Sequence, residues 1–416
     1  MQQKKILLPI YAGIVAFLTY SCMYAFRKPY TAATFESVSV FAINYKVLLV
    51  IAQLIGYTLS KFLGIKVISE LKTHQRALGI IGLIFLAWLA LLLFAITPPA
   101  IGIMCIFLNG IPLGLIWGLV FSYLEGRKTT ELMGAILTVS FIFSSGFVKS
   151  VGKWLMVHFG ISEFYMPFLI GAIFFLPIVF FVFLLEQIPD PSDEDKKLRA
   201  PRPPMTAGQR KAFLESFLPG ITVLVITYIL LTVVRDFRDN FAADIWNENG
   251  YGKAPAIFTI TEIPASLIIL IMMSLLIIEK NNFKALRINH IMILTGFGIA
   301  LMATLAFMLK FISPVIWMTL NGLGLYLGYV PFNCMLFERL IAAFKKPANV
   351  GFLMYIADSF GYLGSIAVLL YKEFGEHQTG WTDFFITMLL GISIIGLLCT
   401  LFSQIYFEKQ KKFYQQ

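Results

Sequence analysis

Long apolar segments follow one another along almost the whole chain, and they restrict its fold more than any other feature. A transmembrane helix needs about 20 mostly apolar residues. Twelve segments meet this requirement, and they cover residues 6–35, 43–64, 77–97, 100–124, 131–155, 164–186, 216–241, 255–279, 289–309, 313–338, 347–371 and 381–407. A membrane barrel is built from alternating strands of about ten residues. These longer runs therefore predict an all-α, polytopic membrane protein with 12 transmembrane helices.

The composition excludes a soluble protein of this length. Hydrophobic residues make up 58% of the 416 residues and charged residues only 13%, whereas about 25% of the residues in soluble domains are charged. The net charge of +10 would also suit a nucleic-acid-binding protein. Cytoplasmic loops of membrane proteins carry an excess of Lys and Arg, however. We therefore expect membrane lipid and no nucleic acid among the partners.

A polar, proline-rich stretch near the middle of the chain separates six predicted spans from six. It covers residues 187–215 and holds five prolines among acidic and basic side chains. We predict an N-terminal six-helix bundle over residues 1–186, a cytoplasmic linker over 187–215 and a C-terminal six-helix bundle over 216–416.

The distribution of positive charges predicts the orientation in the membrane. If the N-terminus is cytoplasmic, the cytoplasmic segments hold 22 Lys and Arg residues and the opposite side holds 7. The positive-inside rule then places both termini in the cytoplasm. The first span follows Lys4 and Lys5 but is longer than a signal peptide's apolar region and lacks a clear cleavage site. We expect an uncleaved, multi-pass protein of the inner (cytoplasmic) membrane.

The two halves of the sequence resemble each other. Asn109-Gly110 in the fourth predicted span recurs 212 residues later as Asn321-Gly322. Arg27 in the first span and Arg235 in the seventh are 208 residues apart. Two pseudo-symmetric repeats of six spans around a central loop are the pattern of the major facilitator fold.

Arg27 and Arg235 are charged groups inside predicted spans, where burial of a charge is costly. A guanidinium stays ionised and offers a planar fork of donors to a phosphate or carboxylate. Two such groups from opposite halves would together favour a dianion. The alternative for Arg27 is that its side chain extends to the membrane interface, because Lys28-Pro29 follows it.

Three further side chains are candidates for the same cavity. Lys61 lies near the end of the second span, where it could instead reach the cytoplasmic face. Tyr20 and Tyr24 precede Arg27 by seven and three residues, so helical spacing puts them near its face. Aromatic side chains in a membrane helix are more often packing residues than ligand contacts.

Acidic residues near the spans suggest a gating or charge network. Glu262 could pair with Lys28, either as a gate that opens and closes or as a static pair. Asp358 could carry a proton, form an ion pair with a cationic group of a substrate, or hydrogen-bond a neighbour as the neutral acid. Asp239 belongs to the mixed cluster over residues 235–239, which we expect to form salt bridges.

Nothing in the sequence indicates catalysis, a metal or a cofactor. The four cysteines and four histidines show no ligand spacing. No GxxxxGK[ST] loop is present, so we expect no ATP-driven motor. We predict a protein that is not an enzyme, has no cofactor and acts as a monomer.

These segments resemble the organophosphate:phosphate antiporters of the major facilitator superfamily, the glycerol-3-phosphate and hexose-phosphate exchangers. The likeness is distant but covers nearly the whole chain. It rests on residues 20–28, Ser60-Lys61-Phe62, residues 228–235, Tyr329, residues 360–364 and Gly380-Trp381. Residues 27–36 differ from the characterised exchangers and suggest a separate branch. The family's fifth-helix histidine is replaced by Ser144, and the tyrosine before its second arginine by Thr232.

The resemblance implies a rocker-switch exchanger. It implies that Arg27 and Arg235 bind phosphate, and that Glu262 is the acid partnered with Lys28. It also implies a set of neighbours in the cavity, namely Lys61, Tyr20, Tyr24, Tyr329 and Tyr362.

We therefore predict alternating-access secondary transport of a small anionic, phosphorylated solute. The same arginines would also suit a carboxylate, a peptide-like solute or a cell-wall-derived anion. A membrane-embedded transferase and a sensor that binds the anion without transporting it are further alternatives. Fold analogy does not name the solute.

Overall fold

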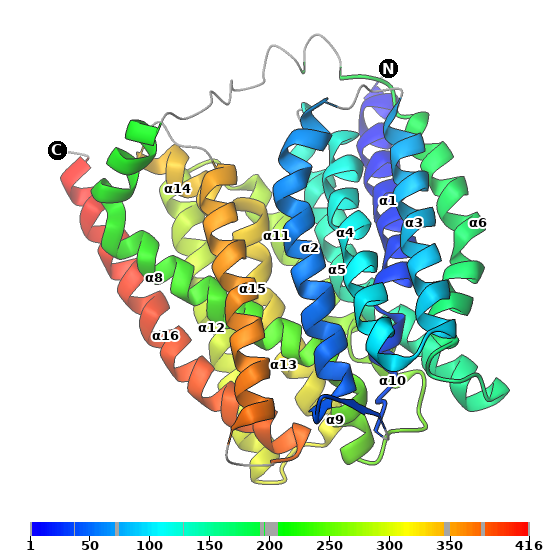
Figure 1. The fold of residues 1–416 in the computed structure, drawn as a ribbon. Helices are drawn as coiled ribbons and strands as arrows, with labels where there is room; N and C mark the ends of the chain where they lie inside the picture. Colours follow the sequence, from blue (N-terminus) through cyan, green and yellow to red (C-terminus); the bar gives the residue numbers. More distant parts are fainter. Residues whose placement is uncertain are drawn as a thin grey trace. The chain divides into compact units, whose positions relative to one another are not determined.

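The computed structural model describes residues 2–36, 38–70, 75–127, 129–191, 195, 207–344, 350–375 and 379–414. Helices make up nearly all of this part of the chain (Figure 1), so the predicted all-α membrane fold is confirmed. One antiparallel hairpin was not predicted. Its strands, β1 (Ser39–Val40) and β2 (Ile43–Asn44), pair Val40 with Ile43. They are too short to show an alternating pattern.

Ten helical segments in the described residues are long and apolar enough to cross a membrane. They are formed by α1 (Gln2–Arg27), α3 (Arg76–Ile96), α4 (Pro99–Ser122), α5 (Thr130–Phe159), α6 (Met166–Glu186), α8 (Ala207–Asn240), α10 (Ile257–Ile260) with α11 (Ile263–Ile278), α12 (Asn282–Met308), α13 (Pro314–Pro331) with η3 (Phe332–Leu336) and α14 (Phe337–Phe344), and α16 (Trp381–Tyr414). The other two predicted spans coincide with α2 (Tyr45–Glu70) and α15 (Val350–Phe374). The protein is a multi-pass membrane protein.

The first helix ends earlier than predicted. We expected the span to continue to residue 35, but α1 ends at Arg27 and a 3-10 turn, η1 (Pro29–Ala32), follows. The last helical hydrogen bond runs from the amide of Lys28 to the carbonyl oxygen of Tyr24, over 2.9 Å. Proline has no amide proton to continue that ladder. A further short helix, α9 (Ala242–Glu248), was not predicted.

The chain forms two compact units that do not coincide with contiguous halves of the sequence. Unit 1 comprises Met1–Arg199, Asp239–Ile263 and Leu369–Thr382. Unit 2 comprises Ala200–Arg238, Pro264–Val368 and Asp383–Gln416. Unit 1 therefore holds α1 to α6 together with α9 and α10, so a segment from the second half of the sequence packs on helices of the first half.

Glycines allow the helices of unit 1 to approach closely. A Cβ atom on Gly110 of α4 would lie 2.6 Å from the carbonyl oxygen of Gln53 in α2. A Cβ on Gly146 of α5 would lie 2.8 Å from Cγ of Glu262 and 3.1 Å from the carbonyl carbon of Phe258 in α10. Such contacts are typical of membrane helices that pack through small residues. The absence of a side chain at Gly146 thus allows α10 to pack closely against α5.

Unit 2 packs α12 against α13 in the same way. A Cβ on Gly296 would collide with the carbonyl oxygen of Gly324, and a Cβ on Gly324 would collide with that of Gly296. Beyond this contact, α13 reaches Pro331 and opens into the π-helical stretch η3. Proline removes a helical hydrogen bond, which explains a local change of pitch here. Tyr329 lies in this last turn of α13.

Candidate functional site

Tyrosine rings surround the predicted anion-binding arginine of unit 1. Cζ of Arg27 lies 4.0 Å from the ring centroid of Tyr57 and 5.8 Å from that of Tyr24. The rings of Tyr20 and Tyr24 are 5.6 Å apart. The structure thus brings together three residues predicted from helical spacing on α1. Tyr57, from α2, was not predicted as a site residue.

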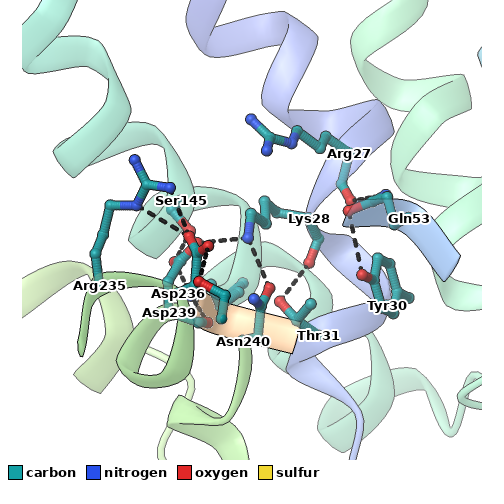
Figure 2. Close-up of polar contacts among 12 residues, drawn as sticks. Arg27, Lys28, Tyr30, Thr31, Gln53, Ser145, Arg235, Asp236, Asp239 and Asn240 are labelled. Atoms are coloured by element: carbon teal, nitrogen blue, oxygen red, sulfur yellow. Dashed lines mark hydrogen bonds and ion pairs between the residues drawn. The ribbon is translucent and has the colours of Figure 1, made fainter. Parts of the chain in front are cut away.

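Two buried amide side chains hold the end of α1 in place. Nδ2 of Asn109 donates to the carbonyl oxygens of Phe26 and Ala87, each over 3.0 Å. Nε2 of Gln53 donates to the carbonyl oxygen of Arg27 over 2.9 Å and to Oδ1 of Asn109 over 3.0 Å. The bonds to Phe26 and Arg27 satisfy carbonyl groups that the end of a helix leaves without an intrahelical donor. Figure 2 shows Gln53 beside the main chain of Arg27.

Lys28, the next residue, belongs to an ion-pair cluster at the same end of unit 1 (Figure 2). Its Nζ lies 2.6 Å from Oδ2 of Asp239 and 2.7 Å from Oδ1 of Asn240. Nζ of Lys149, from α5, lies 2.6 Å from Oδ1 of Asp239. Ser145 donates a hydrogen bond to the same carboxylate. We call Lys28, Ser145, Lys149, Asp239 and Asn240 the Asp239 cluster.

The cluster differs from the sequence prediction in two respects. We expected Glu262 to pair with Lys28, but the carboxylate that forms an ion pair with Lys28 is that of Asp239. Glu262 is buried and packs beside Gly146. Lys149 was not predicted as part of this network, and its side chain is only 4% exposed and forms an ion pair.

A second buried ion pair links α2 to α9. Nζ of Lys46 lies 2.5 Å from Oδ2 of Asp244, 2.7 Å from the carbonyl oxygen of Ala33 and 3.0 Å from that of Thr31. The Lys46 side chain is fully buried and that of Asp244 is 5% exposed. Burial raises the pKa of Asp244 to about 6, against the opposing attraction of the Lys46 ammonium. Neither residue was predicted as part of a site.

The predicted arginine of unit 2 has a carboxylate partner. Nη2 of Arg235 lies 2.6 Å from Oδ1 of Asp236, the next residue in α8 (Figure 2). Arg235 also donates a hydrogen bond to the hydroxyl of Tyr329, and its Cζ lies 4.3 Å from the centroid of that ring. Asp236 in turn accepts a hydrogen bond of 2.8 Å from the hydroxyl of Ser365.

The network of unit 2 extends from Tyr329 to Asp358. The hydroxyls of Tyr228 and Tyr329 are 3.2 Å apart. Tyr228 donates to Oδ1 of Asp358 over 2.5 Å. Tyr362, one turn after Asp358, is also buried. Arg235, Tyr329 and Asp358 thus lie in one network, to which Tyr228 and Ser365 add unpredicted members.

Helical periodicity explains why these side chains meet. Asp358, Tyr362 and Ser365 are four and three residues apart on α15, as are Tyr228, Thr232 and Arg235 on α8, so each set shares a helix face. Glycines remove the bulk between the helices. A Cβ on Gly361 would lie 3.0 Å from Oγ1 of Thr232, and a Cβ on Gly364 2.8 Å from Cγ2 of Ile229.

One predicted site residue lies outside this description. Lys61 lies on α2, but its side chain is not among the described residues. Ser144 donates to the hydroxyl of Ser21 over 2.7 Å. In the described part of the chain, no group of His, Cys, Asp and Glu could hold a metal ion.

Comparison with protein families identifies the chain's relatives. A family model described as "Family of unknown function (DUF5690)" matches residues 29–410. The chain belongs to this family. No curated protein matches it. The family description assigns no solute, and it does not confirm the resemblance to the organophosphate:phosphate antiporters.

Solved structures show the fold of this DUF5690 protein. A D-xylose-proton symporter matches with a TM-score of 0.61 and 16% identity, over 95% of this chain and 96% of the symporter. The nucleoside transporter NupG matches with a TM-score of 0.59 and 16% identity, over 96% and 99%. A bacterial homologue of the human drug peptide transporters PepT1 and PepT2 matches with a TM-score of 0.62 and 11% identity, over 97% and 99%. The chain therefore has the major facilitator fold, as predicted. At these identities the likeness establishes fold alone.

Proposed function

We propose that the protein is a secondary transporter of a small anionic solute, working by alternating access between its two six-helix bundles. One observation carries this proposal. Each unit presents a partly buried arginine with its guanidinium over a tyrosine ring, Arg27 over Tyr57 and Arg235 over Tyr329. A guanidinium whose face is covered keeps its N–H donors in its own plane. Those donors suit the oxygens of a phosphate or a carboxylate.

The charge balance of the proposed site bears on the class of solute. In unit 2, Asp236 offsets the charge of Arg235, and Asp358 adds a second carboxyl group to the network. The two arginines together then offer less than two positive charges. The sequence-based prediction, a phosphorylated dianion, remains the first candidate because of the paired guanidinium forks. The acids of unit 2 favour a second candidate, a singly charged or zwitterionic solute such as a carboxylate or peptide-like anion.

A binding screen separates the two candidates. Purified protein would be heated with matched ligands, glycerol phosphate against glycerate and glucose phosphate against gluconate, and the shift in Tm recorded. Stabilisation by phosphates alone supports the first candidate, and stabilisation by carboxylates alone supports the second. The same ligands, radiolabelled, would then be tested for uptake into proteoliposomes.

The arginines themselves provide the decisive variants. We expect Arg27→Ala combined with Arg235→Ala to abolish both the shift in Tm and the uptake. Arg287→Ala is a suitable control, since the Arg287 side chain is 63% exposed and pairs with exposed Glu408. Full uptake by the double variant would eliminate the proposed anion site. Ligand binding without uptake by the unmodified protein would instead indicate a sensor.

We further propose that the Asp239 cluster acts as a gate of this transporter. Asp239 comes from the second half of the sequence, and Lys28 and Lys149 come from the first half. Separation of these segments would break both ion pairs. Glu262 is buried beside Gly146 of α5. When the cluster opens, Glu262 would replace Asp239 as the ion-pair partner of one of the lysines.

A further inference from the structure

A cavity of about 290 Å³ lies in unit 1 at the end opposite to Arg27. Its lining includes one terminus of each of three membrane-spanning helices. Arg76 is the first residue of α3, Ser122 is the last of α4 and Glu186 is the last of α6. Tyr123, Arg127 and Asp190 complete the polar part of the lining. The cavity therefore lies where the apolar spans give way to the membrane boundary.

Two arginines of the lining retain donors. Nη1 of Arg76 donates to the carbonyl oxygen of Ser122 over 3.3 Å, and its Cζ lies 5.7 Å from the ring centroid of Tyr123. Arg127 donates to the carbonyl oxygen of Pro189, and its buried Nε has no hydrogen-bond partner among the described residues. The hydrogen bonds that these two guanidinium groups make to the described residues thus go to main-chain carbonyl groups, and the carboxylates of Asp190 and Asp195 attract the charge of Arg127 electrostatically.

Two acids also belong to the lining and limit the charge of a ligand. Glu186 accepts a hydrogen bond of 2.7 Å from the hydroxyl of Tyr123, and Asp190 is exposed at the rim. The two acids balance the two arginines in number. A dense polyanion would gain little from such a cavity, whereas a compact group with about one negative charge could occupy the space between the guanidinium forks.

We propose that this cavity binds a phosphoryl group through Arg76 and Arg127. Guanidinium forks match phosphate oxygens in geometry and charge. Pockets with basic side chains between transmembrane helices at the membrane boundary are suited to lipid headgroups. The phosphoryl group could come from a phospholipid headgroup or from free phosphate, since both present the same oxygens. The site is separate from Arg27 and does not depend on the proposed transport activity.

The test uses the full chain carrying Arg27→Ala and Arg235→Ala, so that the proposed transport site contributes no binding. Arg76→Gln with Arg127→Gln removes the two forks. Lys284→Gln with Arg287→Gln is the charge-matched control, because both residues form exposed ion pairs elsewhere. Calorimetry measures affinity for inorganic phosphate. Native mass spectrometry counts molecules of phosphatidylglycerol retained from mixed vesicles that also contain an uncharged glycolipid.

We expect the variant with Arg76→Gln and Arg127→Gln to show at least a tenfold loss either of phosphate affinity or of retained phosphatidylglycerol. The control should show neither loss. A loss in phosphate affinity alone assigns a free phosphate, and a loss in retained phosphatidylglycerol alone assigns a lipid headgroup. Equal behaviour of variant and control in both readouts overturns the proposal. If the glutamine variant does not fold, Arg76→Lys with Arg127→Lys keeps the charges, removes the forks and is judged by the same readouts.

Discussion

Lys28 and Lys149 share a single carboxylate, that of Asp239. Their Nζ atoms lie 2.6 Å from its Oδ2 and Oδ1 respectively, and the three side chains are between 4% and 15% exposed. Two nearly buried cations therefore depend on one anion. Removal of one partner from a buried ion pair leaves an uncompensated charge, which is strongly destabilising.

We therefore expect Asp239→Asn to destabilise the protein by about 3–5 kcal/mol. Thermal unfolding in detergent measures the effect, with Asp383→Asn as the control because Asp383 is exposed on α16. Addition of Lys149→Met to Asp239→Asn should restore part of the loss, since it removes one of the two uncompensated cations. An unchanged Tm in Asp239→Asn would show that the lysines do not need this carboxylate.

The Lys46–Asp244 pair predicts a dependence of stability on pH. The pKa of Asp244 is raised by burial to about 6 in the folded protein, whereas an unperturbed aspartate titrates near 3.9. The folded state therefore holds the Asp244 proton more tightly than the unfolded state does. The contribution of Asp244 to stability falls as pH rises from about 4 to 6.

The variant Asp244→Asn isolates this effect, because it cannot titrate. We expect the stability of the unmodified protein relative to Asp244→Asn to fall by about 2–3 kcal/mol over that pH range. Unfolding curves of both proteins between pH 4 and pH 7 provide the comparison. A relative stability that rises with pH would contradict the raised pKa.

Two glycines two residues apart on α12 should behave differently. A Cβ on Gly296 would collide with the carbonyl oxygen of Gly324, while a Cβ on Gly298 meets nothing within 4 Å. We expect Gly296→Ala to cost about 1–3 kcal/mol, because overpacking forces α12 and α13 apart. Gly298→Ala should be neutral or stabilising, because alanine favours a helix more than glycine does. Equal Tm values for the two variants would argue against the close contact of α12 and α13.

Asn109 offers a local test of how the end of α1 is held. Asn109→Leu would leave the carbonyl oxygen of Phe26 without its side-chain donor, at about 1–3 kcal/mol. We expect faster hydrogen–deuterium exchange at residues 24–28. Asn321→Leu is the matched control in the sequence repeat, because Nδ2 of Asn321 donates within its own helix, to Trp317. Slow exchange in both variants would mean that Asn109 does not hold α1.

The membrane spans were predictable because an apolar run of about 20 residues identifies a spanning helix without knowledge of its neighbours. The hairpin of β1 and β2 and the short helix α9 were not, since neither is long enough to show a period. The end of α1 lay within reach of the sequence. Pro29 marked the place where the amide ladder stops, but the apolar residues beyond it extended the prediction to residue 35.

The site was predictable only in part. Spacing placed Tyr20 and Tyr24 near Arg27, because one helix carries all three. Partners from other helices could not be read from spacing, which is why Tyr57 was missed. Arg235 and Asp236 form an ion pair although adjacent helical residues normally do not face each other. Gln53, an amide inside a predicted span, was an overlooked signal of a buried polar network.

The placement of Asp239–Ile263 within unit 1 has a thermodynamic consequence. Any motion that draws this segment away from α1, α2 and α5 must give up the two lysine contacts of Asp239 and the Lys46–Asp244 pair together. Each additional 1.4 kcal/mol lowers the equilibrium population of the separated arrangement about tenfold. Unassisted excursions should accordingly be rare, and a molecule that favours separation must supply the missing free energy from its own binding.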